Sequence, residues 1–161
     1  LGVRYGYGLV AAAKGSQWAG INPIVIGVDS EHDGVRSNVI AEKNINNVLL
    51  SFDKNCQPVE ILKLDTNLTD QTNAGINAVG LGTYDLIHID GDHSVGGIVS
   101  EIAIAKTWIQ PIGIILIDDC DVAHVESAAL KLCLDYGIAP LYLPTHHRTI
   151  LVDMRKRTIY Q

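Results

Sequence analysis

Apolar runs of strand length recur along the chain and alternate with segments that have helical spacing. Two of them, 24–29 (IVIGVD) and 112–118 (IGIILID), are apolar along almost their whole length. Strands without a polar face are buried on both sides, which is typical of a parallel sheet covered by helices. The pattern therefore predicts an α/β fold with strands at residues 24–29, 59–65, 85–90, 112–118, 138–143 and 149–154.

Segments with apolar residues at helical spacing lie between these strands. One precedes Pro111 and another precedes Gly137, and both residue types commonly follow the end of a helix. The sequence predicts helices, in chain order, at residues 8–14, 35–46, 69–79, 94–110 and 124–136.

Acidic residues stand where the predicted strands end. Ligands of parallel α/β sheets bind beyond the carboxyl ends of the strands. Aspartate is common where any strand enters a turn, but its repetition at one edge of a sheet favours a ligand-binding rim. The four strand-end residues are Asp29, Asp65, Asp90 and Asp118.

Composition and charge narrow the class of protein. The chain has 161 residues, of which 47% are hydrophobic, which predicts a single domain spanning 1–161. Its net charge of −6, with one short basic run at 155–157, disfavours nucleic-acid and anionic-membrane partners. No apolar run is long enough for a membrane span, and no signal-peptide pattern is present. Three widely spaced cysteines predict reduced thiols in the cytoplasm.

The first residues, LGVRYGYG, form a glycine-rich turn before an alanine-rich helix. Glycines allow a ligand to approach the backbone closely, although the spacing differs from the GxGxxG dinucleotide motif. Asp29 follows about twenty residues later and could accept both hydroxyls of a ribose. Together these features indicate an adenosine-containing ligand, without specifying which one.

Two acidic turns, IDGDHS at 89–94 and IDDC at 117–120, predict a metal site. If their strands are neighbours, Asp90, Asp118 and Asp119 converge, and such hard oxygen ligands suit Mg²⁺ or another divalent cation. His93 could face the same rim as a general base, because its ordinary pKa of about 6.5 suits proton abstraction near neutrality. Asp92 is an alternative helix cap.

The other histidines carry less weight. His88, inside a predicted strand, is interpreted as a structural residue. His146 and His147 are too close together to share one metal easily, and no partner pattern supports a zinc site.

With these motifs in order, GVRYGYGLVAAAK, IVIGVD, YDLIHIDGDHS and IILIDDC, the chain resembles class I S-adenosylmethionine-dependent methyltransferases. It is most similar to the metal-dependent O-methyltransferase branch of the macrocin and cephalosporin-biosynthesis type. The resemblance covers nearly the whole chain. It implies a Rossmann-like, three-layer α/β/α fold with strand order 3-2-1-4-5-7-6, strand 7 being antiparallel.

The resemblance also implies a role for each matching residue. S-Adenosylmethionine would be bound by Gly2, Tyr5, Gly6, Asp29, Asp65, Thr66 and Asp90. Mg²⁺ would be bound by Asp90, Asp118 and Asp119, and catalysis would depend on His93 and Asp90. The implied reaction is O-methylation of a small sugar or natural product. No nucleic-acid or membrane partner is implied, and formation of homo-oligomers is left open.

The chain departs from the family pattern in three places. The first strand and the acid before the first glycine are absent, which predicts that residues upstream of Leu1 belong to the full protein. Arg4 stands in place of a second glycine. Val95–Gly96–Gly97 replaces the usual Tyr-acid-Gly.

Two alternatives remain open. A haloacid-dehalogenase-like phosphatase would use Asp90 as nucleophile and Asp92 as acid, although no Ser/Thr strand end and partner lysine stand between its two motifs. A catalytically inactive nucleotide-binding module would keep the fold and lose the activity.

Overall fold

The computed structural model describes residues 11, 13–15, 24–29, 42–43, 45–49, 60–63, 65, 84–144 and 147–156. The chain divides into two compact units, one formed by Gly2–Asp65 and the other by Thr66–Gln161 together with Leu1. Each is described by itself. No helix among the described residues is long and apolar enough to cross a membrane.

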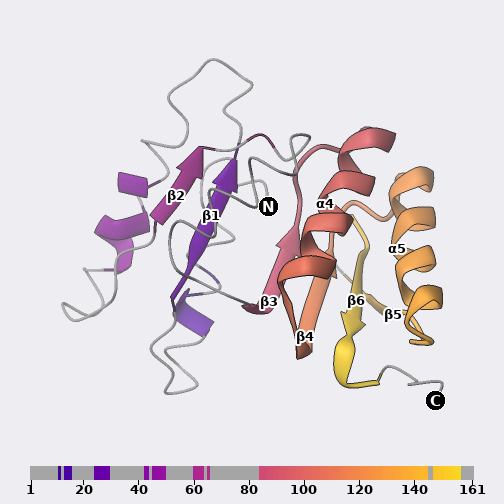
Figure 1. Cartoon of the computed structure of the whole chain (residues 1–161). Helices are drawn as coiled ribbons and strands as arrows, with labels where there is room; N and C mark the ends of the chain where they lie inside the picture. The colour runs from indigo at the N-terminus through magenta and orange to yellow at the C-terminus, as the bar shows by residue number, and fades with distance from the viewer. Residues whose placement is uncertain are drawn as a thin grey trace. The chain divides into compact units, whose positions relative to one another are not determined.

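The second unit contains a four-stranded mixed sheet (Figure 1). Its strands are β3 (Tyr84–Ile89), β4 (Ile109–Ile117), β5 (Leu141–Leu143) and β6 (Thr149–Asp153), in the order β3-β4-β6-β5. β3 and β4 are parallel, and β6 is antiparallel to both of its neighbours. This agrees with the 4-5-7-6 part of the predicted order. The predicted α/β class is therefore confirmed, and the complete strand order stays a prediction.

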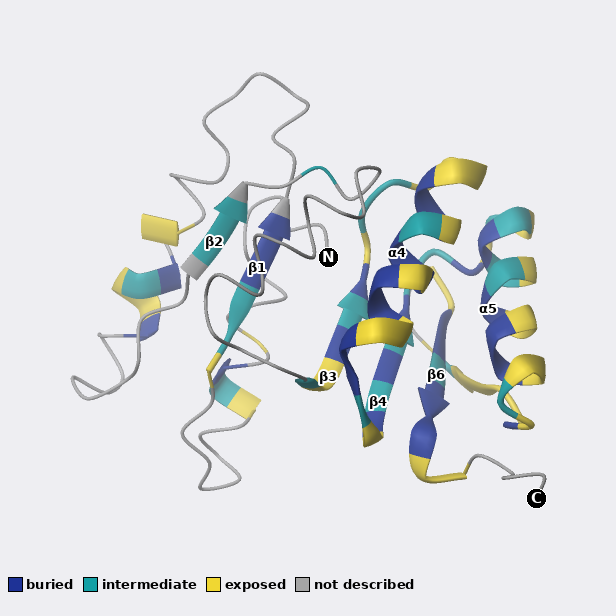
Figure 2. Cartoon of the chain, viewed as in Figure 1, coloured by how far each residue is buried: buried dark blue, intermediate teal, exposed yellow. Residues whose placement is uncertain are grey.

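Two helices bury one side each against this unit. α4 (Val95–Trp108) connects the parallel neighbours β3 and β4, and α5 (Ala123–Asp135) follows β4. The buried positions recur three or four residues apart, as an amphipathic helix requires (Figure 2). The buried apolar residues of the two helices are Ile98, Ile102, Ile104, Ala105, Trp108, Val125, Ala129, Leu132 and Cys133.

The end of α5 follows the prediction closely. Gly137 has a φ of 62°, a left-handed conformation that glycine adopts without steric cost. The backbone amide of Ile138 donates to the Cys133 carbonyl at 2.8 Å, and that of Gly137 donates to the Leu134 carbonyl at 3.1 Å. These two bonds form a Schellman motif, so the sequence located the end of the helix correctly.

The boundary between α4 and β4 differs from the prediction. The helix ends at Trp108 and not at residue 110, and β4 starts at Ile109 and includes Pro111. Proline lacks the amide that a regular ladder needs. The ladder between β3 and β4 is irregular there, because its register shifts between the Tyr84–Ile109 and Leu86–Ile114 pairs. That irregularity accommodates Pro111 within the strand.

The first unit contains the parallel pair β1 (Ile26–Asp29) and β2 (Glu60–Lys63). Both lie inside the predicted strands 24–29 and 59–65. Helical residues occur at 11, 13–15, 42–43 and 45–49. Those at 47–49 lie beyond the end of the helix predicted at 35–46, and residues 35–41 of that prediction lie outside the described residues. Ile45 and Leu49 are buried in this unit. The helix predicted at 69–79 lies outside the described residues.

Candidate functional site

Asp90 and Asp118 stand side by side at the carboxyl edge of β3 and β4. The parallel register pairs Ile89 with Ile117, the last residues of the two strands. The Asp118 amide extends the ladder by donating to the Ile89 carbonyl at 3.0 Å. The structure therefore brings the two acidic turns together, as expected from the sequence if the strands are neighbours.

Hydrogen bonds fix the orientation of the Asp118 carboxylate. Its Oδ1 accepts a hydrogen bond from Thr149 Oγ1 at 2.7 Å and another from the Asp119 amide at 3.0 Å. Thr149 is buried at the start of β6, so the antiparallel strand supports the site from the side. The other oxygen, Oδ2, lies 3.8 Å from Nε2 of His88.

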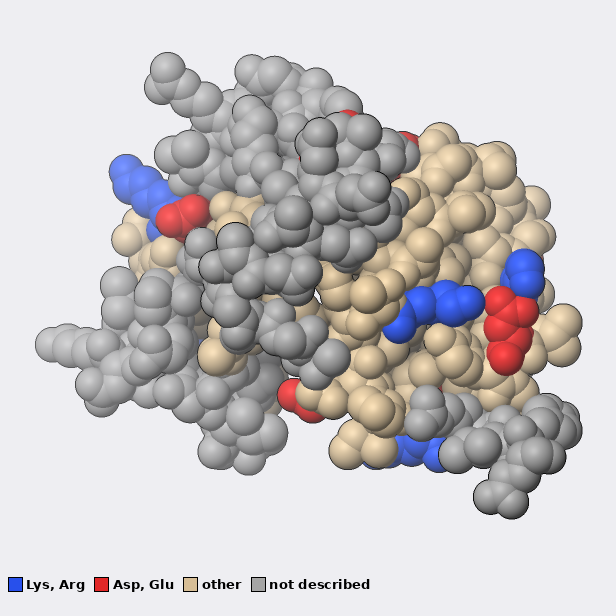
Figure 3. All heavy atoms as spheres, viewed as in Figure 1, with Lys and Arg blue, Asp and Glu red and all other residues tan. Residues whose placement is uncertain are grey.

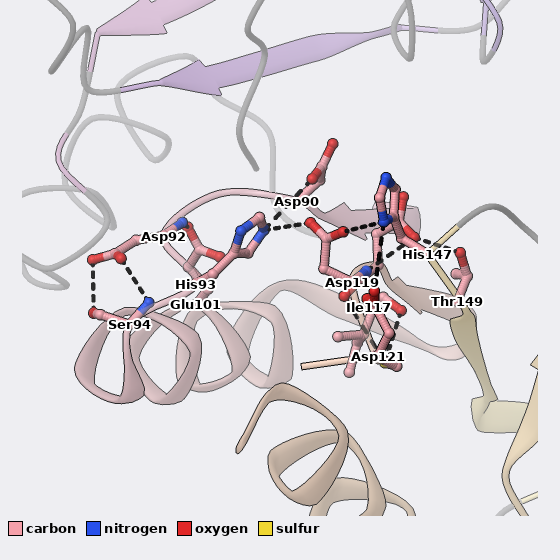
Figure 4. A network of polar contacts seen from close by, with 12 residues as sticks. Asp90, Asp92, His93, Ser94, Glu101, Ile117, Asp119, Asp121, His147 and Thr149 are labelled. Atoms are coloured by element: carbon pink, nitrogen blue, oxygen red, sulfur yellow. Dashed lines mark hydrogen bonds and ion pairs between the residues drawn. The ribbon is translucent and has the colours of Figure 1, made fainter. Parts of the chain in front are cut away.

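The Asp119 carboxylate lies between two histidines, His93 and His147 (Figure 4). The φ of Asp119, 54°, is left-handed, a conformation that aspartate tolerates better than most residues. Its Oδ2 lies 2.8 Å from Nε2 of His93, and its Oδ1 lies 3.6 Å from Nδ1 of His147. His93 Nε2 is also 3.7 Å from Asp90 Oδ1. His93 therefore faces the rim, as predicted.

His147 and Asp121 are site residues that sequence reasoning missed. The two lie 3.6 Å apart, measured from His147 Nδ1 to Asp121 Oδ2. A reciprocal pair of bonds holds their loops together: the Cys120 amide donates to the Arg148 carbonyl at 2.9 Å, and Arg148 Nη2 donates to the Cys120 carbonyl at 3.2 Å. No short-range sequence signal links these loops, because α5 and β5 stand between them in the chain. His146 lies outside the described residues.

The electrostatics of this edge reflect an excess of carboxylates. Burial raises the pKa of Asp90, and the nearby Asp118 and Asp119 raise it further against the opposing effect of His88 and His93. Burial is also the main cause that lowers the pKa of His88, which favours the neutral imidazole. A bound cation would relieve the repulsion among these carboxylates.

Oxygen and imidazole donors at this edge are close enough to bind a divalent cation. Among the described residues, three groups offer three ligand atoms within 4.8 Å of one another. None of the three joins Asp90, Asp118 and Asp119, the set implied by the family resemblance. The groups are His88–Asp90–Asp118, Asp90–His93–Asp119 and Asp119–Asp121–His147. The donor chemistry fits a divalent cation in each case.

The IDGDHS turn is held by its own side chains. The Asp92 carboxylate accepts from the Ser94 amide at 2.8 Å and from Ser94 Oγ at 3.1 Å. Ser94 is the N-cap of α4, and its Oγ accepts from the Gly97 amide at 3.0 Å. The Asp92 amide donates to Oε1 of the buried Glu101 at 3.2 Å. Ser94 is therefore the helix cap, and not Asp92 as the sequence alternative proposed; Asp92 orients the cap residue. His93 is fixed between these two anchored residues.

The glycines of this region differ in what they permit. A Cβ at Gly91 would lie 2.0 Å from Glu101 Oε1, and one at Gly97 would lie 2.3 Å from Asp92 Cγ. A Cβ at Gly96 would meet nothing within 4 Å. Gly97 is thus required for packing against Asp92, whereas Gly96 is not.

Comparison with known proteins identifies the family. A family model described as a methyltransferase domain matches residues 1–120. The chain belongs to this methyltransferase family. No curated protein sequence matches it. The predicted class, an S-adenosylmethionine-dependent methyltransferase, is confirmed at this level.

Solved methyltransferases share the fold at low sequence identity. A TDP-rhamnose 3'-O-methyltransferase of calicheamicin biosynthesis has a TM-score of 0.65 and 14% identity, over 94% of this chain and 69% of that chain. The O-methyltransferase NovP has a TM-score of 0.64 and 14% identity over the same shares. A mycinamycin-pathway methyltransferase in complex with Mg and SAH has a TM-score of 0.55 and 12% identity, over 92% of this chain and 50% of that chain. These likenesses confirm a Rossmann-like methyltransferase fold.

Two of the predicted cofactor residues, Asp29 and Asp65, are described in the first unit. Asp29 is the last residue of β1, opposite Lys63, and Asp65 follows two residues after β2 and is half-buried. Both are therefore at strand ends, as the sequence predicts. The remaining predicted cofactor residues, Gly2, Tyr5, Gly6 and Thr66, lie outside the described residues.

Family membership and the turn geometry decide against the phosphatase alternative. The methyltransferase model matches through both acidic turns. Both Asp92 carboxylate oxygens accept hydrogen bonds from Ser94, the N-cap of α4, so Asp92 has a structural role in the turn.

Proposed function

We propose that this domain transfers a methyl group from S-adenosylmethionine to a hydroxyl group of a small molecule, assisted by a divalent cation at the ends of β3 and β4. The observation that carries the proposal is the joint position of two acidic turns and His93 at one edge of a methyltransferase sheet. Ligands of such sheets bind at this edge.

The cation would be held by carboxylates drawn from Asp90, Asp118 and Asp119. When bound there, it would lower the pKa of the acceptor hydroxyl and orient its oxygen. Asp118 presents an oriented carboxylate because Thr149 and the Asp119 amide hold one of its oxygens. The same-fold mycinamycin-pathway enzyme is described in complex with Mg, which supports this choice.

His93 would accept the proton of the hydroxyl group. Its Nε2 lies 2.8 Å from Asp119, so Nε2 carries the hydrogen of that bond and Nδ1 keeps the lone pair that takes the proton. Asp119 fixes the orientation of the ring, as the carboxylate of an Asp–His pair does in other enzymes. The backbone carbonyl of His93 accepts a hydrogen bond from His124 Nε2, which anchors the main chain at this point.

S-Adenosylmethionine would supply a methyl group activated by the sulfonium charge. The acceptor oxygen gains the methyl group, the sulfur keeps the electron pair of the broken bond, and the hydroxyl proton passes to His93. From the family resemblance, Asp29 would hold the ribose hydroxyls and Asp65 and Thr66 would lie near the adenine. Gly2, Tyr5, Gly6 and Asp90 would complete the cofactor site.

The acceptor we propose is a sugar or natural-product hydroxyl. Support comes from the same fold in enzymes described as a TDP-rhamnose 3'-O-methyltransferase and an O-methyltransferase. An acidic chain with no basic patch on the sequence favours such an acceptor over nucleic acid.

The test is calorimetric titration of S-adenosylhomocysteine, followed by methyl transfer from labelled S-adenosylmethionine to a panel of sugar and phenolic hydroxyl acceptors. We expect binding that is lost in Asp29→Ala, and transfer that stops when EDTA removes divalent cations. Asp85→Ala is the matched control, because Asp85 is exposed at the opposite end of β3. Absence of binding would contradict the proposal and favour the inactive module. Hydrolysis of p-nitrophenyl phosphate would favour the phosphatase.

A further inference from the structure

His88 lies beside the two acidic strand ends, and the reaction described above gives it no role. It lies in β3, one residue before the last residue of that strand, and Asp90 directly follows the strand. Its Nε2 is 3.8 Å from Asp118 Oδ2. His88, Asp90 and Asp118 together offer three ligand atoms within 4.8 Å of one another.

The distance between His88 and Asp118 fits two ligands of one cation better than a hydrogen bond. At 3.8 Å, nitrogen and oxygen are too far apart for a hydrogen bond. Two ligands of one cation are separated by about 3.0–4.2 Å when each bond is about 2.1 Å long. The observed spacing falls in that interval, so both atoms can reach one cation without moving.

One of the two other groups, Asp90–His93–Asp119, has a different geometry. His93 Nε2 and Asp119 Oδ2 are 2.8 Å apart, which is the length of a charge-assisted hydrogen bond. A ring nitrogen that donates a hydrogen bond has no lone pair to give to a metal. The His93–Asp119 pair is therefore arranged for proton transfer.

The carboxylate of Asp118 is already oriented toward His88. Its Oδ1 is held by Thr149 Oγ1 and by the Asp119 amide, and its Oδ2 faces the imidazole. Thr149 itself is buried in the β6 strand. The position of Oδ2 is thus set by the sheet and needs no rearrangement on binding.

We propose that His88, Asp90 and Asp118 bind the cation of this domain, and that Asp119 serves to hold His93. This inference rests on the proposed cation-assisted methyl transfer and specifies its ligands. An imidazole ligand favours first-row transition ions such as Fe²⁺ or Co²⁺ over Mg²⁺, which prefers oxygen. The domain therefore takes a transition-metal ion in preference to magnesium.

The test is pulsed electron paramagnetic resonance of Mn²⁺ added to the wild-type protein. A coordinated imidazole produces nitrogen-14 modulation of the manganese signal, which the proposal predicts. The modulation disappears in His88→Gln and persists in His93→Gln, the matched control for the second histidine of the cluster. Affinity for Co²⁺ falls at least about 10-fold in His88→Gln, and affinity for Mg²⁺ falls less.

Three results would overturn the inference. They are bound Mn²⁺ without nitrogen modulation in the wild type, modulation lost in His93→Gln and kept in His88→Gln, and no binding of Mn²⁺ at all. The wild-type spectrum decides the question even if His88→Gln fails to fold. S-Adenosylhomocysteine is titrated into the same samples, because cofactor binding does not require His88. This titration distinguishes a failure of the proposed metal ligands from a failure of the methyltransferase proposal.

Discussion

Acidic residues at two places in the second unit have opposite surroundings. Asp135 at the end of α5 and Asp153 at the end of β6 are matched by cationic side chains: Asp135 by Lys131 and Lys106, and Asp153 by Arg155. In Figure 3 acidic and basic side chains adjoin at the right of the view. At the carboxyl edge of β3 and β4, the ion pairs within the described part of the chain join Asp90, Asp118 and Asp119 to histidines only.

The difference also appears in the pKa values. Hydrogen bonds from Arg155 lower the pKa of Asp153, and one from Lys131 lowers that of Asp135. Burial and neighbouring carboxylates raise the pKa of Asp90. Lysine and arginine keep an acid ionised for stability, whereas acids gathered beside histidines can bind a cation or move a proton. Asp92 also has a structural role, since both of its carboxylate oxygens accept hydrogen bonds from Ser94.

The largest expected effect is the loss of methyl transfer when an acid at the ends of β3 and β4 is replaced, compared with an acid paired to arginine. Asp118→Asn lowers methyl transfer by about two to four orders of magnitude, because loss of the cation costs several kcal/mol of charge stabilisation. Asp153→Asn leaves turnover per folded molecule unchanged. Steady-state assays at saturating cofactor measure both. Equal losses in the two variants would erase the contrast between the two regions.

Substituting the proposed base has the next largest effect. His93→Gln lowers kcat by about 100-fold, in the range expected for loss of a general base. Because the base is lost, the pH dependence of kcat differs between the variant and the wild type. The measurement is a pH–rate profile from pH 5 to 9 with cofactor saturating. An identical profile in both proteins would exclude His93 as the base.

Substitutions of Gly96 and Gly97, at the start of α4, test whether Asp92 has a structural role. Gly97→Ala forces Asp92 aside, because the new Cβ would lie 2.3 Å from its Cγ, and we expect a loss of about 1–3 kcal/mol in the free energy of unfolding. Gly96→Ala, the neighbouring control, gains up to about 1 kcal/mol from helix propensity. Urea unfolding of both variants measures the difference. A gain in both would show that Asp92 is not anchored as described.

The smallest effect is on the pH dependence of stability in EDTA. The lowered pKa of Asp153 stabilises the fold above about pH 4, and that contribution is lost as pH falls through the folded-state pKa. The raised pKa of Asp90 acts oppositely, so its contribution is lost as pH rises through that pKa. Asp90→Asn therefore raises Tm slightly at pH 7, and Asp153→Asn lowers it. Thermal melts from pH 3 to 7 check both signs, and a fall in Tm for Asp90→Asn would contradict the account.

Local signals predicted the features that depend on local structure. Apolar runs ending in aspartate located Asp90 and Asp118, since a buried strand must be apolar and its end meets solvent. Gly137 marked the end of α5 because a left-handed cap favours glycine. Pro111 misled the prediction, since the strand register shift that accommodates it is a property of the sheet.

Features that depend on tertiary contacts could not be predicted in this way. The left-handed turn at Asp119 decides that its carboxylate meets His93 and not Asp118, and no residue pattern announces that conformation. The sequence led to a structural interpretation of His88, because a single histidine in a strand does not reveal which residues of the neighbouring strand lie beside it. His147 reaches the site only through the pairing of Arg148 with Cys120, 28 residues apart in sequence.

The most direct test compares cation binding after substitution of Asp118, which lies beside a histidine, and of Asp153, which is paired with Arg155. Mn²⁺ is titrated by calorimetry into the wild type, Asp118→Asn and Asp153→Asn. The account predicts that the wild type and Asp153→Asn bind with the same affinity, and that Asp118→Asn binds at least about 10-fold more weakly. Equal titrations of all three proteins, or none in the wild type, would contradict the claim that the ends of β3 and β4 form a cation site.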